Sequence, residues 1–90
     1  PEKISVMNPT YPNPFNSSIQ FSFSNIPEPL NLNVSFYNLN GQLVEFLSIE
    51  NIAENEIVKW TPSLELSSGT YFLQANLGNN VFNQKILFIK

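Results

Sequence analysis

The sequence predicts an all-β domain built as an antiparallel sandwich. Strand-like segments recur at roughly the 8–12-residue spacing typical of such folds, and no apolar stripe with a helical period persists. The three glycines all fall at expected turns, and none interrupts a strand. A chain of 90 residues is long enough for one hydrophobic core and leaves no room for a second. We therefore expect residues 1–90 to form one domain.

The first expected strand contains Ile4 and Val6, and a turn-rich segment follows it. In that segment Pro12 and Pro14 flank Asn13. Each proline removes a backbone hydrogen-bond donor and biases the residue before it toward an extended conformation. We expect a stiff crossing loop here rather than a strand that pairs with a neighbour.

The next segments alternate apolar with polar residues, as half-buried strands do. Residues 19–24 and 30–36 both follow this pattern, and the second gives the clearest alternation in the chain. Asn40-Gly41 then supplies two residues that tolerate a positive φ, which is the strongest short signal for a β-hairpin. Residues 43–47 are expected to return antiparallel to residues 30–36.

Residues 56–60, 70–77 and 81–89 are the last three expected strands, and Trp60 and Tyr71 should point into the core. The predicted fold class is therefore a seven-stranded antiparallel immunoglobulin-like β-sandwich, with two sheets packed face to face. The expected core consists of Phe21, Val34, Phe36, Val58, Trp60, Tyr71, Leu73 and Ile86.

The composition excludes several classes of partner. The formal net charge is -3, and four lysines without any arginine cannot form a phosphate-binding patch, so no nucleic acid is expected. The absence of cysteine excludes disulfides and thiolate metal sites. No segment approaches the roughly 18 apolar residues that a membrane helix needs, so we expect no membrane insertion.

Catalysis is not expected, because the chain lacks histidine, cysteine, aspartate and arginine. A serine nucleophile would have no imidazole base, and a zinc ion would lack nitrogen and sulfur ligands. Glu54 and Glu56 share one side of an extended segment, yet no apolar pocket near them would prepare either as an acid. The sequence therefore predicts no enzyme activity, no metal site and no cofactor.

The last six residues are the most informative segment. They run Lys85, Ile86, Leu87, Phe88, Ile89 and Lys90, with four large apolar residues between two lysines. Because successive strand side chains point to opposite faces, both faces of this segment are expected to need cover. One interpretation is a final strand covered by the domain's own core, whose lysines disfavour pairing with a strand of another chain. The other is a segment on which another protein docks.

Four motifs occur in order along nearly the whole chain: Tyr11–Asn16, Asn38–Val44, Leu66–Phe72 and Lys85–Lys90. Together they resemble the C-terminal sorting domain, type A, of the type IX (Por) secretion system. A similar pattern occurs in the immunoglobulin-like domain of flagellar hook-capping proteins and in modules appended to bacterial glycosidases and proteases. The structural positions in the resemblance are Pro12, Asn13, Pro14, Asn40, Gly41, Gly69 and Tyr71, and Trp60 is similar to the family's core tryptophan.

The resemblance implies a sorting signal. The domain would fold in the periplasm at the C-terminus of a larger secreted precursor, and the start at Pro1 fits a module cut from such a chain. The outer-membrane translocon would recognise Lys85–Lys90. A sortase-like protease would then remove the domain and join its cargo to surface lipopolysaccharide, so the cargo would end at the cell surface or outside the cell.

The alternative is a retained immunoglobulin-like accessory or carbohydrate-binding module of an extracellular enzyme. Four aromatic residues fall on faces opposite the expected core: Tyr37, Phe46, Phe72 and Phe82. Scattered exposed rings are normal on a folded domain, whereas a contiguous row could stack on sugars. A clustered aromatic row would favour the alternative, and an accessible terminal strand without such a row would favour the sorting signal.

Overall fold

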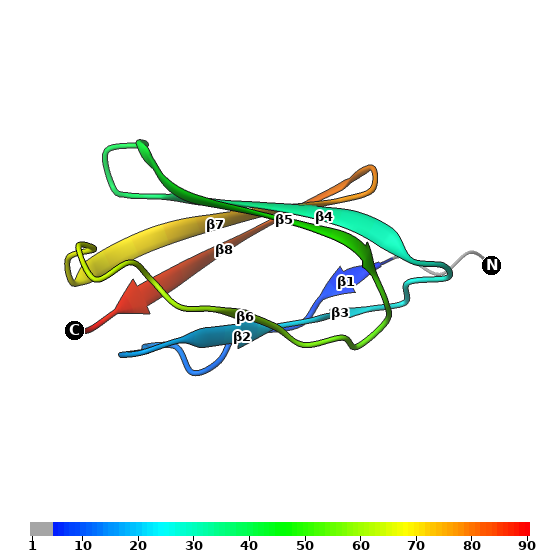
Figure 1. Cartoon of the computed structure of the whole chain (residues 1–90), viewed down its shortest axis with the longest axis horizontal. Helices are drawn as coiled ribbons and strands as arrows, with labels where there is room; N and C mark the ends of the chain where they lie inside the picture. The colour runs from blue at the N-terminus through cyan, green and yellow to red at the C-terminus, as the bar shows by residue number, and fades with distance from the viewer. Residues whose placement is uncertain (1–4) are drawn as a thin grey trace.

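Residues 5–90, which the computed structural model describes, form strands joined by turns and loops and contain no helix that could cross a membrane. The molecule is elongated, with extents of 42 × 22 × 21 Å. The strands in this range are β1 (Val6–Met7), β2 (Ile19–Phe21), β3 (Phe23–Ser24), β4 (Leu30–Tyr37), β5 (Leu43–Ile52), β6 (Val58–Trp60), β7 (Gly69–Leu77) and β8 (Asn80–Phe88) (Figure 1).

The strands lie in two layers. One layer is a four-stranded sheet in the order β5-β4-β7-β8, in which every neighbouring pair is antiparallel. The facing layer consists of the antiparallel pairs β2-β6 and β1-β3. β2 and β3 follow each other with only Ser22 between them, so they act as one interrupted strand with β6 and β1 as partners (Figure 1).

The predicted all-β sandwich is confirmed, with one difference in the strand count. The expected strand over residues 19–24 is split at Ser22, whose carbonyl oxygen accepts a hydrogen bond of 2.9 Å from the backbone N–H of Asn8 outside the regular ladders. The described residues therefore contain eight strands rather than seven. In the first strand Met7 is the buried residue and Val6 is exposed, while Ile4 lies outside the described residues.

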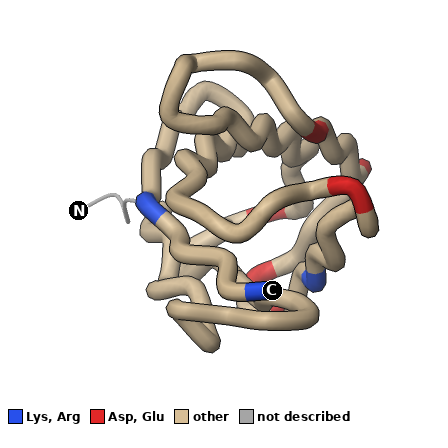
Figure 2. Tube along the Cα trace, turned by 90° about the vertical axis from the view of Figure 1, so that its left-hand side faces the viewer, with Lys and Arg blue, Asp and Glu red and all other residues tan. Residues whose placement is uncertain are grey.

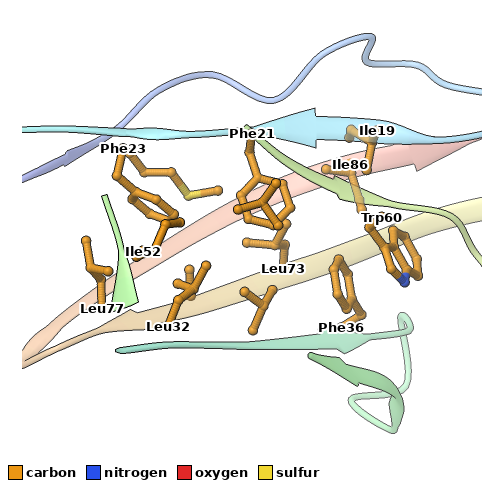
Figure 3. Packing of buried hydrophobic residues seen from close by; sticks show 14 of the residues in the cluster. Ile19, Phe21, Phe23, Leu32, Phe36, Ile52, Trp60, Leu73, Leu77 and Ile86 are labelled. Carbon is orange, nitrogen blue, oxygen red and sulfur yellow. The ribbon is translucent and has the colours of Figure 1, made fainter. Parts of the chain in front are cut away.

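All eight residues predicted for the core are buried. Side chains from the two layers interdigitate between the sheets, as Figure 3 shows. The alternation of apolar and polar residues predicted these positions correctly because one face of each sheet packs on the core and the other faces solvent. The core also holds Ile19, Phe23 and Leu32, from the apolar faces of the predicted alternating strands, and three residues that were not predicted: Phe15, Ile52 and Leu77.

Trp60 and Tyr71 are buried in the core, and their polar atoms have partners. The rings of Trp60 and Phe36 stack across the two layers with centroids 3.9 Å apart (Figure 3). The Trp60 indole N–H donates to the Glu45 carboxylate. The Tyr71 hydroxyl donates to the backbone oxygen of Ser67 at 2.5 Å, which is the backbone partner expected for a buried tyrosine.

The hairpin between β4 and β5 exists, but its turn differs from the predicted two-residue turn. The Gly41 N–H donates to the Asn38 carbonyl at 3.0 Å, and Gly41 has a φ of 79° whereas Asn40 does not have a positive φ. The Asn38 side-chain oxygen accepts hydrogen bonds from the N–H groups of Asn40 and Gln42 at 2.9 and 3.0 Å. Asn38 therefore organises a longer loop, as asparagine often does in turns.

Candidate functional site

Residues 85–88 of the terminal motif form the end of β8, the edge strand of the four-stranded sheet, and Ile89 and Lys90 follow the strand. β8 pairs with β7 through a regular register in which Tyr71 faces Ile86 and Gly69 faces Phe88. The other side of β8 has no regular strand partner, and residues 13–15 of this chain cover it along the terminal motif. The fold therefore brings the predicted recognition segment to a border of the sheet.

The two faces of the terminal motif differ sharply in burial. Ile86 and Phe88 point into the core and are buried. Lys85 and Lys90 are exposed, Leu87 is half-buried and Ile89 is 50% exposed. Both faces of this segment were expected to need cover, but this chain buries only one of them. The four residues of the motif that are not buried, Lys85, Leu87, Ile89 and Lys90, are named the terminal rim here.

The proline loop, residues 8–16, runs along the free edge of the terminal motif. The backbone N–H of Phe15 donates to the Leu87 carbonyl at 2.9 Å, and the Ile89 N–H donates to the Phe15 carbonyl at 2.8 Å. The Asn13 side chain donates to the Lys85 carbonyl and accepts from the Leu87 N–H, both at 3.0 Å. The loop was expected not to pair with a strand, but Phe15 makes a parallel bridge with Phe88.

Phe15 also fixes the inner face of the terminal motif. Its ring stacks on Phe88 with centroids 5.1 Å apart and lies 6.0 Å from the Trp60 ring. Aromatic pairs at such distances stabilise by about 0.5–1.5 kcal/mol beyond the effect of burial. The Phe15 ring thus links the first motif to Trp60 and to the last motif. Sequence reasoning missed Phe15 as a core residue because prolines and asparagines surround it.

The remaining two motifs lie at the same end of the sandwich. The Lys90 N–H donates to the Ser68 hydroxyl and the Lys90 ammonium donates to the Leu64 carbonyl, both at 2.7 Å. Residues 38–40 and 68–71 line one shallow hollow beside them. Figure 1 shows this end around the C-terminus, with β1 toward the other end, and Figure 2 views the molecule from the C-terminal end.

Two shallow hollows flank the chain at Phe88–Lys90. Pro12, Pro14 and Phe15 line the first together with Ile89. Thr61–Leu64 line much of the second, which also contacts Phe88 and Lys90. Both hollows are mainly apolar, and a cationic side chain borders the second. Such a surface can hold apolar side chains of a partner next to a carboxylate.

The glutamate pair considered for acid–base work has structural partners instead. The Glu54 carboxylate accepts a hydrogen bond of 2.7 Å from the Asn25 N–H, and the Glu56 carboxylate accepts one of 3.1 Å from the Ala53 N–H. Each carboxylate thus holds a different backbone turn. No group of three or more possible metal ligands occurs within residues 5–90.

The four aromatics expected outside the core divide into two sets. Phe82 was assigned wrongly: it faces inward in register with Ala75, and its ring lies 5.6 Å from that of Phe23. Tyr37 and Phe72 are direct cross-strand partners on the outer face, and Phe46 lies close by on β5. Three exposed or half-exposed rings therefore gather on the outer face of the four-stranded sheet.

These features define a class of protein: a small antiparallel β-sandwich whose signature motifs meet at one end to hold and present a terminal strand. The model for the secretion system C-terminal sorting domain matches residues 9–90, and the chain belongs to this family. The chain is therefore a C-terminal sorting signal of the type IX (Por) secretion system. Such a domain is attached to cargo that crosses the outer membrane, and the secretion system recognises it.

Among solved structures, dimeric latent PorU from Porphyromonas gingivalis is similar in fold, with a TM-score of 0.65 and 21% sequence identity over 97% of this chain. The match covers only 10% of the PorU chain, so the present chain corresponds to a small part of that protein. No curated protein matches the chain.

Proposed function

We propose that the domain delivers its attached cargo to the outer-membrane translocon, which reads the terminal rim. After transport a sortase-like protease removes the domain, and the cargo remains at the cell surface or outside the cell. The observation that carries this proposal is that the terminal motif is buried at some positions and accessible at others. Ile86 and Phe88 hold the strand on the core, while Lys85, Leu87, Ile89 and Lys90 stay accessible. The domain is a ligand and a substrate in this scheme and has no catalytic role.

The arrangement separates the roles of neighbouring residues. Removing Phe88 would leave a cavity in the core, so deletion of the last three residues would disturb folding as well as recognition. Charge reversal at Lys85 and Lys90 leaves the buried face intact, although it removes the hydrogen bond from Lys90 to Leu64. Because exposed substitutions usually change stability by about 0.5 kcal/mol or less, this variant isolates recognition from folding.

The test is a fusion of the chain behind a periplasmic reporter, in a bacterium with a type IX secretion system. The wild-type fusion is expected to bring the reporter to the cell surface. Lys85→Glu with Lys90→Glu is expected to leave it in the periplasm with an unchanged melting curve. Lys59→Glu is the matched control, because Lys59 is an exposed lysine on β6 in the facing layer. Export that continues undiminished in the double variant would contradict the proposal.

The alternative function, a retained accessory or carbohydrate-binding module, is favoured by one observation. Tyr37, Phe46 and Phe72 cluster on the outer face, and exposed rings on a sheet can stack on sugars. A retained module would bind an insoluble polysaccharide such as cellulose or chitin and stay attached to its enzyme. A fusion that binds no polysaccharide and is cleaved after export would exclude this function.

A further inference from the structure

One row of residues crosses the outer face of the four-stranded sheet. The four motifs contain only some of its members. Tyr37 on β4 is opposite Leu43 on β5 and Phe72 on β7, and Phe72 is in turn opposite Lys85 on β8. Cross-strand partners present their side chains on the same face of a sheet. The row therefore spans all four strands and ends at the first lysine of the terminal motif.

The row is apolar and open to solvent. Leu43 is 57% exposed, Phe46 53% and Phe72 42%, while Tyr37 and Leu87 are half-buried. Phe46 joins the row because its partner Ser35 is two residues from Tyr37 and therefore on the same face. Exposed apolar side chains that gather on one face of a small domain make that face a candidate for partner binding. Leu43, Tyr37, Phe46, Phe72 and Leu87 are named the outer row here.

The outer row is continuous with the terminal rim. Lys85 and Leu87 belong to the rim, and they pair with Phe72 and Thr70 of β7. A partner that contacts the rim from the outer face of the sheet must therefore also lie over Phe72. Interfaces commonly place aromatic anchors near their centre and charged groups at their border, as this surface does.

We propose that the outer row and the terminal rim form one docking surface for the protein of the secretion machinery that receives the cargo. This inference rests on the proposed function, because it names the surface through which the same partner binds. The partner has an apolar surface that accepts the rings of Phe46 and Phe72, with a carboxylate opposite Lys85. The terminal motif alone is then only the border of the recognised surface.

A protein partner fits the outer row better than a sugar does. Tyr37 is the one member of the outer row with a hydrogen-bonding group, its hydroxyl, and the other four side chains offer none to sugar hydroxyls. Three side-chain amides of the outer face already use one atom each in bonds within the sheet. Ser48 donates to Asn33 at 2.9 Å, and Gln74 donates to Asn83 at 3.4 Å.

The test uses the reporter fusion with Phe46→Thr and Phe72→Thr combined. Threonine keeps the β-branched shape that suits strands but removes the ring. We expect about a tenfold fall in surface delivery, in the range seen when hot-spot aromatics are lost. Val81→Thr is the matched control, because Val81 is 55% exposed on the same face at the opposite end of β8, and it should export normally.

A second variant keeps the test decisive if the double variant folds poorly. Phe46→Lys alone places a charge in the outer row on β5, opposite Ser35 and away from the core. It should also reduce delivery while the melting curve stays that of the wild type. Undiminished export of Phe46→Lys in a folded domain would overturn the inference.

The outcomes separate this inference from the proposed function. If the Lys85 and Lys90 reversal stops export but the outer-row variants export normally, the docking surface is limited to the rim and the inference is wrong. If the wild-type fusion is not exported, both proposals fall. Normal export with loss of binding to cellulose or chitin would assign the row to a glycan. Normal export with conversion of a dimer to a monomer in gel filtration would assign it to a second copy.

Discussion

Single residues in this domain carry the contact between the layers, and Trp60 is the clearest example. Its indole lies between Phe36, stacked at 3.9 Å, and Phe15, at 6.0 Å, and it is 2% exposed. Its N–H also donates to the carboxylate of Glu45, which lies on β5. One side chain thus joins both sheets and the proline loop.

Trp60→Ala is expected to lower the free energy of unfolding by about 3–5 kcal/mol, through lost burial and the cavity left behind. Since domains of this size have only about 5–15 kcal/mol of stability in total, we expect the variant to be partly unfolded at 37 °C. Urea denaturation followed by circular dichroism measures the change. Trp60→Phe keeps a ring but loses the N–H donor, so its free energy of unfolding should lie between those of the wild type and Trp60→Ala. A midpoint for Trp60→Ala equal to that of the wild type would contradict the core role of the indole.

At this scale the sequence predicted the core well where alternation was regular. Phe15 was missed because its burial depends on Phe88 and Trp60, which are distant in sequence, and no local period marks it. Phe82 was assigned to the wrong face although it has the same parity as Ile86, which was placed correctly in the core. Because every second residue of a strand points to the same face, Phe82 should have been placed in the core together with Ile86.

Among the elements, the β4–β5 hairpin shows how one turn sets the position of two long strands. Asn38 accepts two backbone hydrogen bonds through its side chain, and Gly41 closes the turn with a φ of 79°. The sequence predicted the hairpin and its flanking strands, but not the turn type. The Asn-Gly pair suggests a two-residue turn, and the additional hydrogen bonds of Asn38 favour a longer one.

Gly41→Val is expected to destabilise the domain by about 1–2 kcal/mol or more, because side chains with a Cβ are strained in the left-handed region. A Cβ added at Gly41 would meet no atom of the surrounding residues within 4 Å, so the cost comes from the backbone rather than from a clash. Gly41→Asn is the matched control, since asparagine tolerates this conformation better. The shift in urea midpoint should be clearly smaller for Asn than for Val, and equal midpoints would show that the left-handed conformation is not required.

In the whole molecule, the fold gathers motifs that are far apart in sequence at one end. The Asn13 side chain contacts Leu87 across 74 positions of the chain, and Lys90 contacts Ser68. The resemblance of the motifs predicted the family, but no local pattern could predict that the proline loop holds the terminal strand. That information lies in the pairing of β7 with β8 and in the return of the proline loop to their edge.

The proline loop should therefore control how firmly the terminal strand is held. Asn13→Ala removes the side-chain oxygen that accepts the Leu87 N–H at 3.0 Å. Loss of a hydrogen bond that stabilises by about 1 kcal/mol should speed local opening and amide exchange at Leu87 by about fivefold. Amide exchange followed by nuclear magnetic resonance measures this, with amides in the middle of β7 as internal references that should not change.

Asn13→Asp provides the matched control for this prediction. Aspartate keeps an oxygen that can accept from Leu87 but loses the donor to the Lys85 carbonyl. Protection at Leu87 should therefore persist in Asn13→Asp and fall in Asn13→Ala. If the Leu87 amide exchanges equally fast in both variants and in the wild type, Asn13 does not hold the strand. The buried ring of Phe88, stacked at 5.1 Å on Phe15, would then be what keeps the terminal motif in place.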